Sequence, residues 1–123
     1  MNYRNLNHSR TEFAINFITG DCVDPSEMSA LIQAMPSLIR TNGLGNAMIF
    51  LKQVKGDRRK GNGMQLYINV FSEWLRHLQI LGPNADLINT IQIADQNWYI
   101  EAKAESYKMA NILRFVYSQM FDK

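Results

Sequence analysis

Five basic side chains gather in nine consecutive positions of this chain. They are Lys52, Lys55, Arg58, Arg59 and Lys60, and the acid among them is Asp57. Lysine and arginine bind phosphate groups without reading bases, and they release counterions when they do so. This basic stretch therefore predicts contact with a polyanion, but a solvated loop between two helices explains the charge alone equally well.

A second polar row is expected near the C-terminus. Helical spacing places five polar residues on one face: Lys103, Tyr107, Asn111, Arg114 and Ser118. An aromatic ring among basic residues suits stacking on an unpaired base, although a solvated helix face is the commoner explanation. Arg40 is a further candidate for contact with a polyanion, or it pairs with an acid of a neighbouring helix or subunit.

The side chains that catalysis would require are scattered. They comprise two distant histidines and two short acidic groups: His8 and His77; Asp21, Asp24 and Glu27; Glu101 and Glu105. Pro25 interrupts the first acidic group, and Glu105 is expected to balance Lys108. The single cysteine, Cys22, has no second sulfur with which to build a metal site. The sequence predicts no enzyme, no metal site and no cofactor.

A glycine-rich segment, residues 42–45, lies between two stretches of helical pattern. Neither a dinucleotide-binding fingerprint nor a phosphate-binding loop fits it. If residues 37–55 form one helix, Gly43 lets a neighbouring helix come close. Gly45 then leaves backbone uncovered beside Thr41 and the lysines of the basic stretch, and a phosphate chain fits against this face. Alternatively, Gly45 is merely tolerated in the helix, or the helix breaks at Asn42-Gly43 as a tight turn, and spacing alone favours these alternatives over a phosphate contact.

Apolar residues recur with helical period almost throughout the chain. The pattern predicts helices that start near Ser9, Asp24, Ser37, Asn62, Ala85 and Gln96, with a kink or restart at Pro36. The helix from Asn62 is expected to continue to Leu81, where Gly82-Pro83 stops it, and the last helix to run to about Phe121. We therefore expect one all-helical domain over residues 1–123, a compact bundle of about five to six helices. No apolar run approaches the roughly 20 residues that cross a bilayer, which predicts a cytoplasmic protein.

Residues 36–51, PSLIRTNGLGNAMIFL, resemble the signature of the small subunit of the type III-B CRISPR Cmr effector complex. Its most specific part is Thr41, Asn42, Gly43, Leu44 and Gly45. Residues 66–75 and 99–114 resemble the middle and C-terminal helices of that family. One departure is Ile112, which stands where the family usually has tryptophan.

The resemblance implies a non-catalytic subunit of an RNA-guided antiviral complex. Its partners would be other Cmr subunits, neighbouring copies of itself and crRNA-bound target RNA, with no membrane. Family context favours RNA as the polyanion at the basic stretch, and Arg40 and the C-terminal pair Lys103 and Arg114 are further candidates for RNA contact. The alternative is a scaffold subunit that binds proteins and makes no direct RNA contact.

Overall fold

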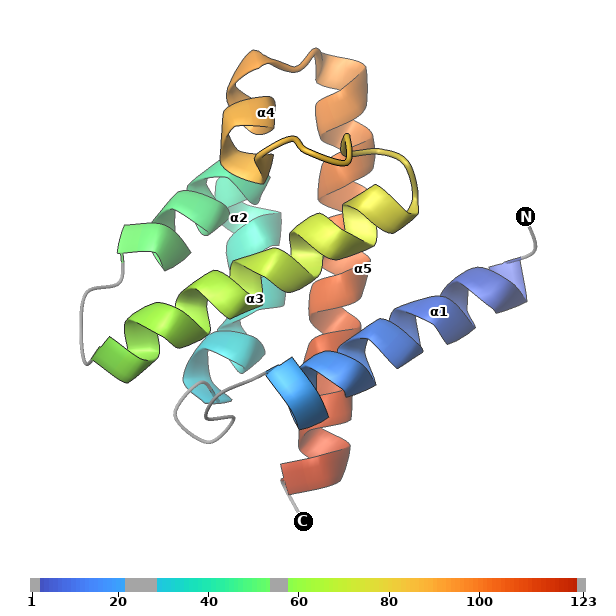
Figure 1. Ribbon diagram of the computed structural model, residues 1–123, viewed down its shortest axis with the longest axis vertical. Coiled ribbons are helices and arrows are strands. Elements are labelled where there is room, and N and C mark those ends of the chain that lie inside the picture. Colours follow the sequence, from blue (N-terminus) through green and yellow to red (C-terminus); the bar gives the residue numbers. More distant parts are fainter. Residues whose placement is uncertain (1–2, 22–28, 54–57, 122–123) are drawn as a thin grey trace.

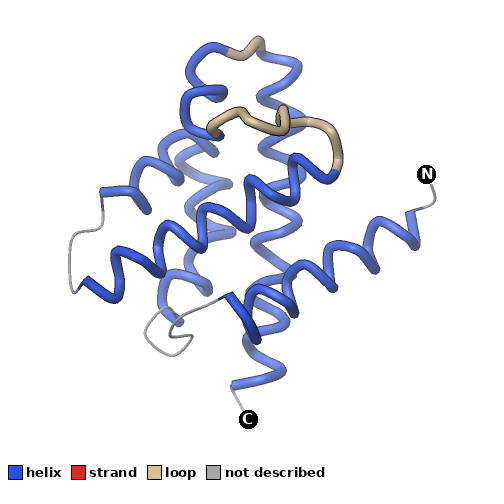
Figure 2. The backbone as a smooth tube through the Cα atoms, viewed as in Figure 1, coloured by secondary structure: helices blue, strands red, loops and turns tan. Residues whose placement is uncertain are grey.

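The computed structural model describes residues 3–21, 29–53 and 58–121, and the side chains of 8–19, 31–51 and 68–120. These residues form α1 (Tyr3–Asn16), the π-helical turn η1 (Phe17–Asp21), α2 (Ser29–Gln53), α3 (Arg58–His77), α4 (Leu87–Ile93) and α5 (Gln96–Phe121). No strand occurs in the described part of the chain (Figure 2). The predicted all-helical bundle is confirmed.

Helix α5 is the central element of the bundle. It runs the length of the molecule, α1 and α3 cross it, and α4 lies at its N-terminal end (Figure 1). Its most extensive packing is against α2. The side chains of Phe17, Phe71 and Trp74 are the largest that are fully buried, and they fill the core where these helices meet.

Several predicted helix starts are wrong. Helix α1 begins at Tyr3, so Ser9 lies inside it and does not cap it. Helix α3 begins at Arg58, four residues before the predicted Asn62. Arginine and lysine are good helix formers, and packing of the apolar face further along α3 supports the added turn. The predicted start at Asp24 lies outside the described residues.

The end of α3 also differs from the prediction, which continued the helix to Leu81. The backbone turns at Gln79, whose φ is 63°. The amide of Ile80 donates to the carbonyl of Leu75 at 2.9 Å, and the amide of Gln79 donates to that of Arg76 at 2.9 Å. This is a Schellman motif, which stops a helix by satisfying its last carbonyls, so the later Gly82-Pro83 pair is not what ends α3.

Helix α2 breaks at Gly43 and not at Pro36. Gly43 has φ 86° and ψ 162°, a conformation that only glycine adopts readily, and α2 changes direction along its length (Figure 1). Pro36 lies within the helix. Burial of Met35 and Ile39 on either side of it outweighs the hydrogen bond that proline cannot make. The interpretation as one continuous helix is wrong, and the break at Asn42-Gly43 is confirmed.

The two glycines of α2 serve different purposes. The backbone amide of Leu44 donates to the Tyr99 hydroxyl at 3.0 Å, so α5 holds the break in place. A Cβ added to Gly43 would lie 2.6 Å from that hydroxyl oxygen. A Cβ on Gly45 would lie 3.2 Å from Cγ2 of Ile91, because α4 packs there. Gly45 therefore packs against a helix and does not offer the open backbone that the continuous-helix interpretation gave it.

A buried ion pair joins α1 to α5. Nη2 of Arg10 donates to Oε1 of Glu105 at 2.8 Å, and the two side chains are only 6% and 14% exposed. Nε1 of Trp74 donates to the same oxygen at 3.3 Å, and Nζ of Lys108 reaches Oε2 at 3.3 Å. The guanidinium of Arg10 also lies 5.6 Å from the centre of the Trp74 ring. The predicted balance of Glu105 by Lys108 is confirmed, but the nearer partner is Arg10.

The pKa of Glu105 makes stability depend on pH. Burial alone raises this pKa, but hydrogen bonds and positive charge from Arg10, joined by Lys108, outweigh burial and hold the pKa below its ordinary 4.5. Because the folded pKa is the lower one, the carboxylate stabilises the fold above pH 4.5, and this contribution is lost as the pH falls through the folded pKa.

We expect the difference in unfolding free energy between the wild type and Glu105→Gln to shrink on acidification below pH 4.5. Urea unfolding at a series of pH values measures this difference. A difference that stays constant under acid conditions would contradict the assignment.

Candidate nucleic-acid interface

A groove follows the contact between α2 and α5, and it consists of two adjoining hollows. Arg40 of α2 and Tyr107 of α5 line both of them. Two more basic residues, Lys103 and Arg114, come from the same face of α5. The structure thus brings together three basic residues that were predicted as candidates in separate segments of the sequence.

The first hollow has a volume of about 710 Å³ and a largely apolar lining. It is bordered by Arg40, Gln96, Tyr99, Ile100, Lys103, Ala104 and Tyr107. Ile100 is 57% exposed, so an apolar surface in this hollow is open to solvent. This hollow suits a flat apolar group with a charged neighbour.

The second hollow has a volume of about 400 Å³ and a polar lining. It is bordered by Pro36, Ser37, Arg40, Thr41, Tyr107, Asn111 and Arg114. Nη2 of Arg114 donates to Oδ1 of Asn111 at 3.4 Å, a contact that leaves the other donors of this guanidinium available. Two guanidinium groups on opposite walls suit an anion such as phosphate.

The Tyr107 hydroxyl is affected by the positive charge of the groove. Hydrogen bonding to the Asn111 side chain and to the Arg40 guanidinium lowers the pKa of Tyr107 below its ordinary value of 10.0, and the charges of Arg40 and Arg114 add to this effect. Among the described side chains, no carboxylate forms an ion pair with Arg40, Lys103 or Arg114. The groove therefore presents positive charge to solvent.

Local sequence explains how the groove is positioned. Oδ1 of Asp95 accepts from the backbone amide of Trp98 at 2.9 Å, which caps the N-terminus of α5. From there, spacings of three and four residues place Lys103, Tyr107 and Arg114 on one face. Arg40 lies one turn before the break at Gly43, in the part of α2 that reaches the groove.

A family model described as CRISPR-associated protein (Cas_Cmr5) matches residues 6–118, nearly the whole chain. The chain belongs to the Cmr5 family. It is therefore a member of the small-subunit family of type III-B CRISPR systems, and association with other subunits of the Cmr complex follows from that membership. Searches of the curated proteins and of the solved structures return no match.

The basic stretch of this Cmr5-family chain, residues 52–60, lies only partly within the described residues. Lys55 lies outside the described residues. The backbone of Lys52 belongs to the end of α2, and Arg58, Arg59 and Lys60 form the start of α3, where the sequence predicted a loop. Their part in RNA binding stays a prediction.

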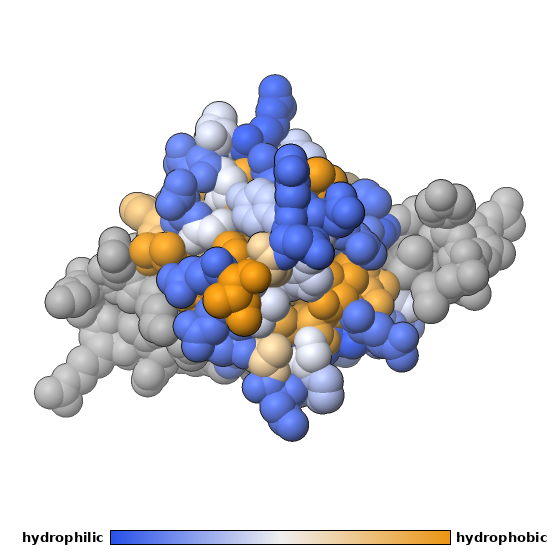
Figure 3. Space-filling model, turned by 90° about the horizontal axis from the view of Figure 1, so that it is seen from above, coloured by the Kyte–Doolittle hydropathy of each residue, from blue (hydrophilic) through white to orange (hydrophobic). Residues whose placement is uncertain are grey.

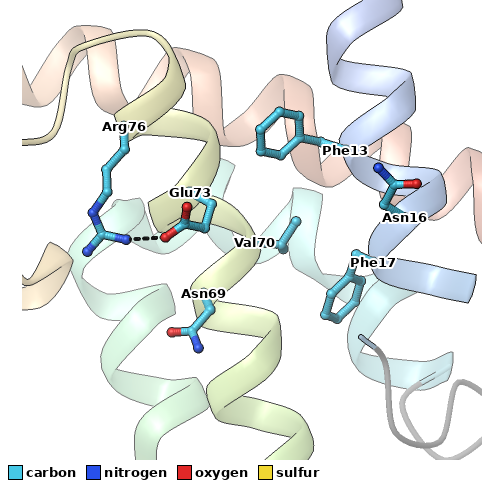
Figure 4. A pocket seen from close by; sticks show the side chains of 7 residues that line it. All are labelled: Phe13, Asn16, Phe17, Asn69, Val70, Glu73 and Arg76. Carbon is cyan, nitrogen blue, oxygen red and sulfur yellow. Dashed lines mark hydrogen bonds and ion pairs between the residues drawn. The ribbon is translucent and has the colours of Figure 1, made fainter. Parts of the chain in front are cut away.

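A further hollow, of about 540 Å³, separates α1 and η1 from α3 (Figure 4). Phe13 and Phe17 face Val70 across it. Arg76 at its edge is held by Glu73 at 2.6 Å and by the carbonyl of Ala85 at 2.7 Å. Because these partners hold the guanidinium of Arg76 against the turn after α3, this guanidinium is not available to bind an anion in the hollow.

Each of the two histidines contacts a residue of its own helix. Nε2 of His8 lies 2.8 Å from Glu12, one helical turn away, and the ring of His77 stacks on that of Trp74 at 5.4 Å. No group of three metal-ligating side chains occurs in the described part of the chain. Within the same residues, no helix has the length and apolar character that crossing a bilayer requires.

Proposed function

We propose that this Cmr5-family chain is a non-catalytic subunit of a cytoplasmic type III-B effector complex and that its α2–α5 groove contacts guide-bound target RNA. The observation that supports this most is the convergence of Arg40, Lys103 and Arg114 on one groove. Contacts of this type position a phosphate backbone without reading sequence. That matches a complex in which base pairing with the guide supplies the specificity.

The proposed role divides the basic residues into two groups. Arg40, Lys103 and Arg114 form the groove, while Lys52, Lys55, Arg58, Arg59 and Lys60 would extend the positive surface at the other end of α2. Neighbouring copies of the subunit, side by side, would then offer the RNA a row of such surfaces. The basic groove favours a passive electrostatic role.

Replacing Arg40, Lys103 and Arg114 together by glutamine is expected to weaken retention of target RNA by the reconstituted complex. Each lost phosphate contact makes the plot of log K against log salt shallower by about 1. The complex should still assemble, because Arg40 and Arg114 are exposed side chains. Filter binding over a salt series measures the slope, and size-exclusion chromatography measures assembly.

A matched control is available on α5. Lys108→Gln removes the same charge from the same helix as Arg114→Gln, but Lys108 lies outside both hollows. Only the Arg114 variant should change the slope. If the triple variant assembles and its slope equals that of the wild type, the RNA role is wrong.

A scaffold without RNA contact is the second candidate function. The surface at the α4 end of the molecule is mostly hydrophilic with an apolar patch near its centre (Figure 3). Ile93, at the end of α4, is 86% exposed, so it offers a large apolar side chain to a partner protein. Unchanged RNA retention in the groove variant, together with lost assembly in an Ile93→Ser variant, would favour this function.

A further inference from the structure

The two hollows of the α2–α5 groove differ in chemistry in the same way as the two halves of a nucleotide. The first is apolar and aromatic, and the second is polar and cationic. We propose that the groove is a subsite for one nucleotide with an unpaired base, the base lying in the first hollow against Tyr107 and its phosphate in the second between Arg40 and Arg114. This inference rests on the proposed function and adds a base-binding element to it.

The first hollow has the size and surface that an unpaired base requires. Its volume of about 710 Å³ exceeds that of a single base and falls in the range typical of small-ligand sites. Ile100 and Ala104 are one helical turn apart, and both are exposed, so they form an open apolar floor. The ring of Tyr107 is half-buried beside them, which limits its motion and favours stacking.

Tyr99 makes the wall of this hollow rigid. Its hydroxyl accepts the amide hydrogen of Leu44 at 3.0 Å, so the ring is fixed between α2 and α5 before any ligand arrives. Gln96 borders the hollow at the start of α5 and has both a donor and an acceptor for the edge of a base. A fixed aromatic wall lowers the entropic cost of binding.

The second hollow has the donors that a phosphate requires. Arg40 and Arg114 approach it from α2 and α5, and the Asn111 side chain accepts from Arg114 and interacts with the Tyr107 hydroxyl. No aspartate or glutamate is among the described residues that line either hollow. An anion here would meet attraction from both walls, which is the arrangement that guanidinium pairs provide for phosphate.

Continuity between the hollows points to one nucleotide and not to two unrelated ligands. Arg40 and Tyr107 belong to both linings, so the hollows meet at these side chains. A base and its own phosphate can therefore occupy them together. A base that is paired in a duplex is stacked between its neighbours and cannot enter, so the occupant is an unpaired nucleotide.

The first experiment titrates the isotope-labelled full chain, by nuclear magnetic resonance, with adenosine 5′-monophosphate, adenosine and inorganic phosphate. Adenosine should shift the amides around Ile100 and Ala104, phosphate those around Asn111 and Arg114, and the nucleotide both sets. Because the two halves are linked, the nucleotide should bind about tenfold more tightly than either part.

The outcomes separate this inference from the proposed function. If phosphate and nucleotide bind equally tightly and adenosine shifts nothing, the base subsite is wrong while phosphate contact by the groove stands. If none of the three ligands shifts groove amides, the subsite is wrong altogether. The salt slope of the assembled complex then tests the RNA role independently.

Three variants test the assigned roles of the side chains. Tyr107→Phe keeps the ring and should bind adenosine as the wild type does, whereas Tyr107→Ala should lose about tenfold in affinity. Arg114→Gln should weaken phosphate binding but leave adenosine binding unaffected, because Arg114 lines only the second hollow. If Tyr107→Ala binds adenosine with wild-type affinity and the same melting temperature, stacking is excluded.

A last comparison identifies the source of the nucleotide. A short single-stranded oligonucleotide should bind more tightly than the mononucleotide, because its additional phosphates can contact Lys103 at the edge of the first hollow. An oligonucleotide of the same length without bases should keep the additional phosphate contacts but should no longer shift the amides around Ile100 and Ala104. Equal affinity for mononucleotide and oligonucleotide would overturn the assignment to an RNA strand.

Discussion

Replacement of Glu105 by glutamine is expected to lower the free energy of unfolding by about 3–5 kcal/mol, the usual cost of removing one member of a buried ion pair. Arg10, whose side chain is 6% exposed, would keep its charge and lose its bidentate partner. The amide of glutamine still accepts from Trp74, but it has no charge to offset the guanidinium. Urea unfolding followed by circular dichroism measures the change.

The chain offers a matched control for this substitution. Glu73 pairs with Arg76 at 2.6 Å, but its side chain is 61% exposed. Glu73→Gln should therefore cost no more than about 1 kcal/mol, the usual contribution of a surface ion pair. Equal costs for the two variants would show that burial does not decide the strength of the Arg10–Glu105 pair.

Pairing between distant residues is what the sequence could not predict. Arg10 and Glu105 are 95 positions apart, and nothing in either local pattern indicates the other. Glu105 has helical spacing to Lys108, and that pairing was predicted because it depends on one helix alone. The stronger partner depends on how α1 crosses α5, which follows from packing of the whole core.

The helices themselves were predictable wherever the apolar period was long. The boundaries of α5 were predicted as residues 96–121, and the structure has Gln96–Phe121. The ends of α3 were not, because a run of helix formers extends its start and a non-glycine residue, Gln79, adopts the left-handed conformation at its end. Left-handed glutamine has no sequence signal, since asparagine and glycine are the residues expected there.

The groove was predicted only as separate parts. Lys103, Tyr107, Asn111 and Arg114 follow from the period of one helix. Their meeting with Arg40 depends on the position of the break in α2, and the sequence left that position open between two interpretations. The family match over residues 6–118 identifies the chain but does not describe which side chains meet.

Gly43→Ala is expected to lower the free energy of unfolding by about 2–6 kcal/mol. One part is backbone strain, about 1–3 kcal/mol, because φ 86° and ψ 162° are essentially restricted to glycine. The other part is steric, since the new Cβ would lie 2.6 Å from the Tyr99 hydroxyl oxygen. Moving that hydroxyl away leaves the buried Leu44 amide without its acceptor, at a cost of about 1–3 kcal/mol.

A double-mutant cycle separates these two parts. Tyr99→Phe removes the hydroxyl, so Gly43→Ala in that background should cost only the strain, and the two substitutions should be less than additive. Gly82→Ala is the control, because its Cβ would meet Ala85 at an ordinary 3.6 Å. It should change stability by no more than about 0.5 kcal/mol.

The same variant tests the link between the break and the groove. Tyr99 both holds the break at Leu44 and lines the first hollow, so a shifted Tyr99 ring also changes the wall against which the base is proposed to lie. Gly43→Ala should therefore weaken adenosine binding more than phosphate binding, under conditions in which the variant is still folded. A variant as stable as the wild type, with unchanged adenosine binding, would mean that α2 does not need glycine at this position and that the break does not support the groove.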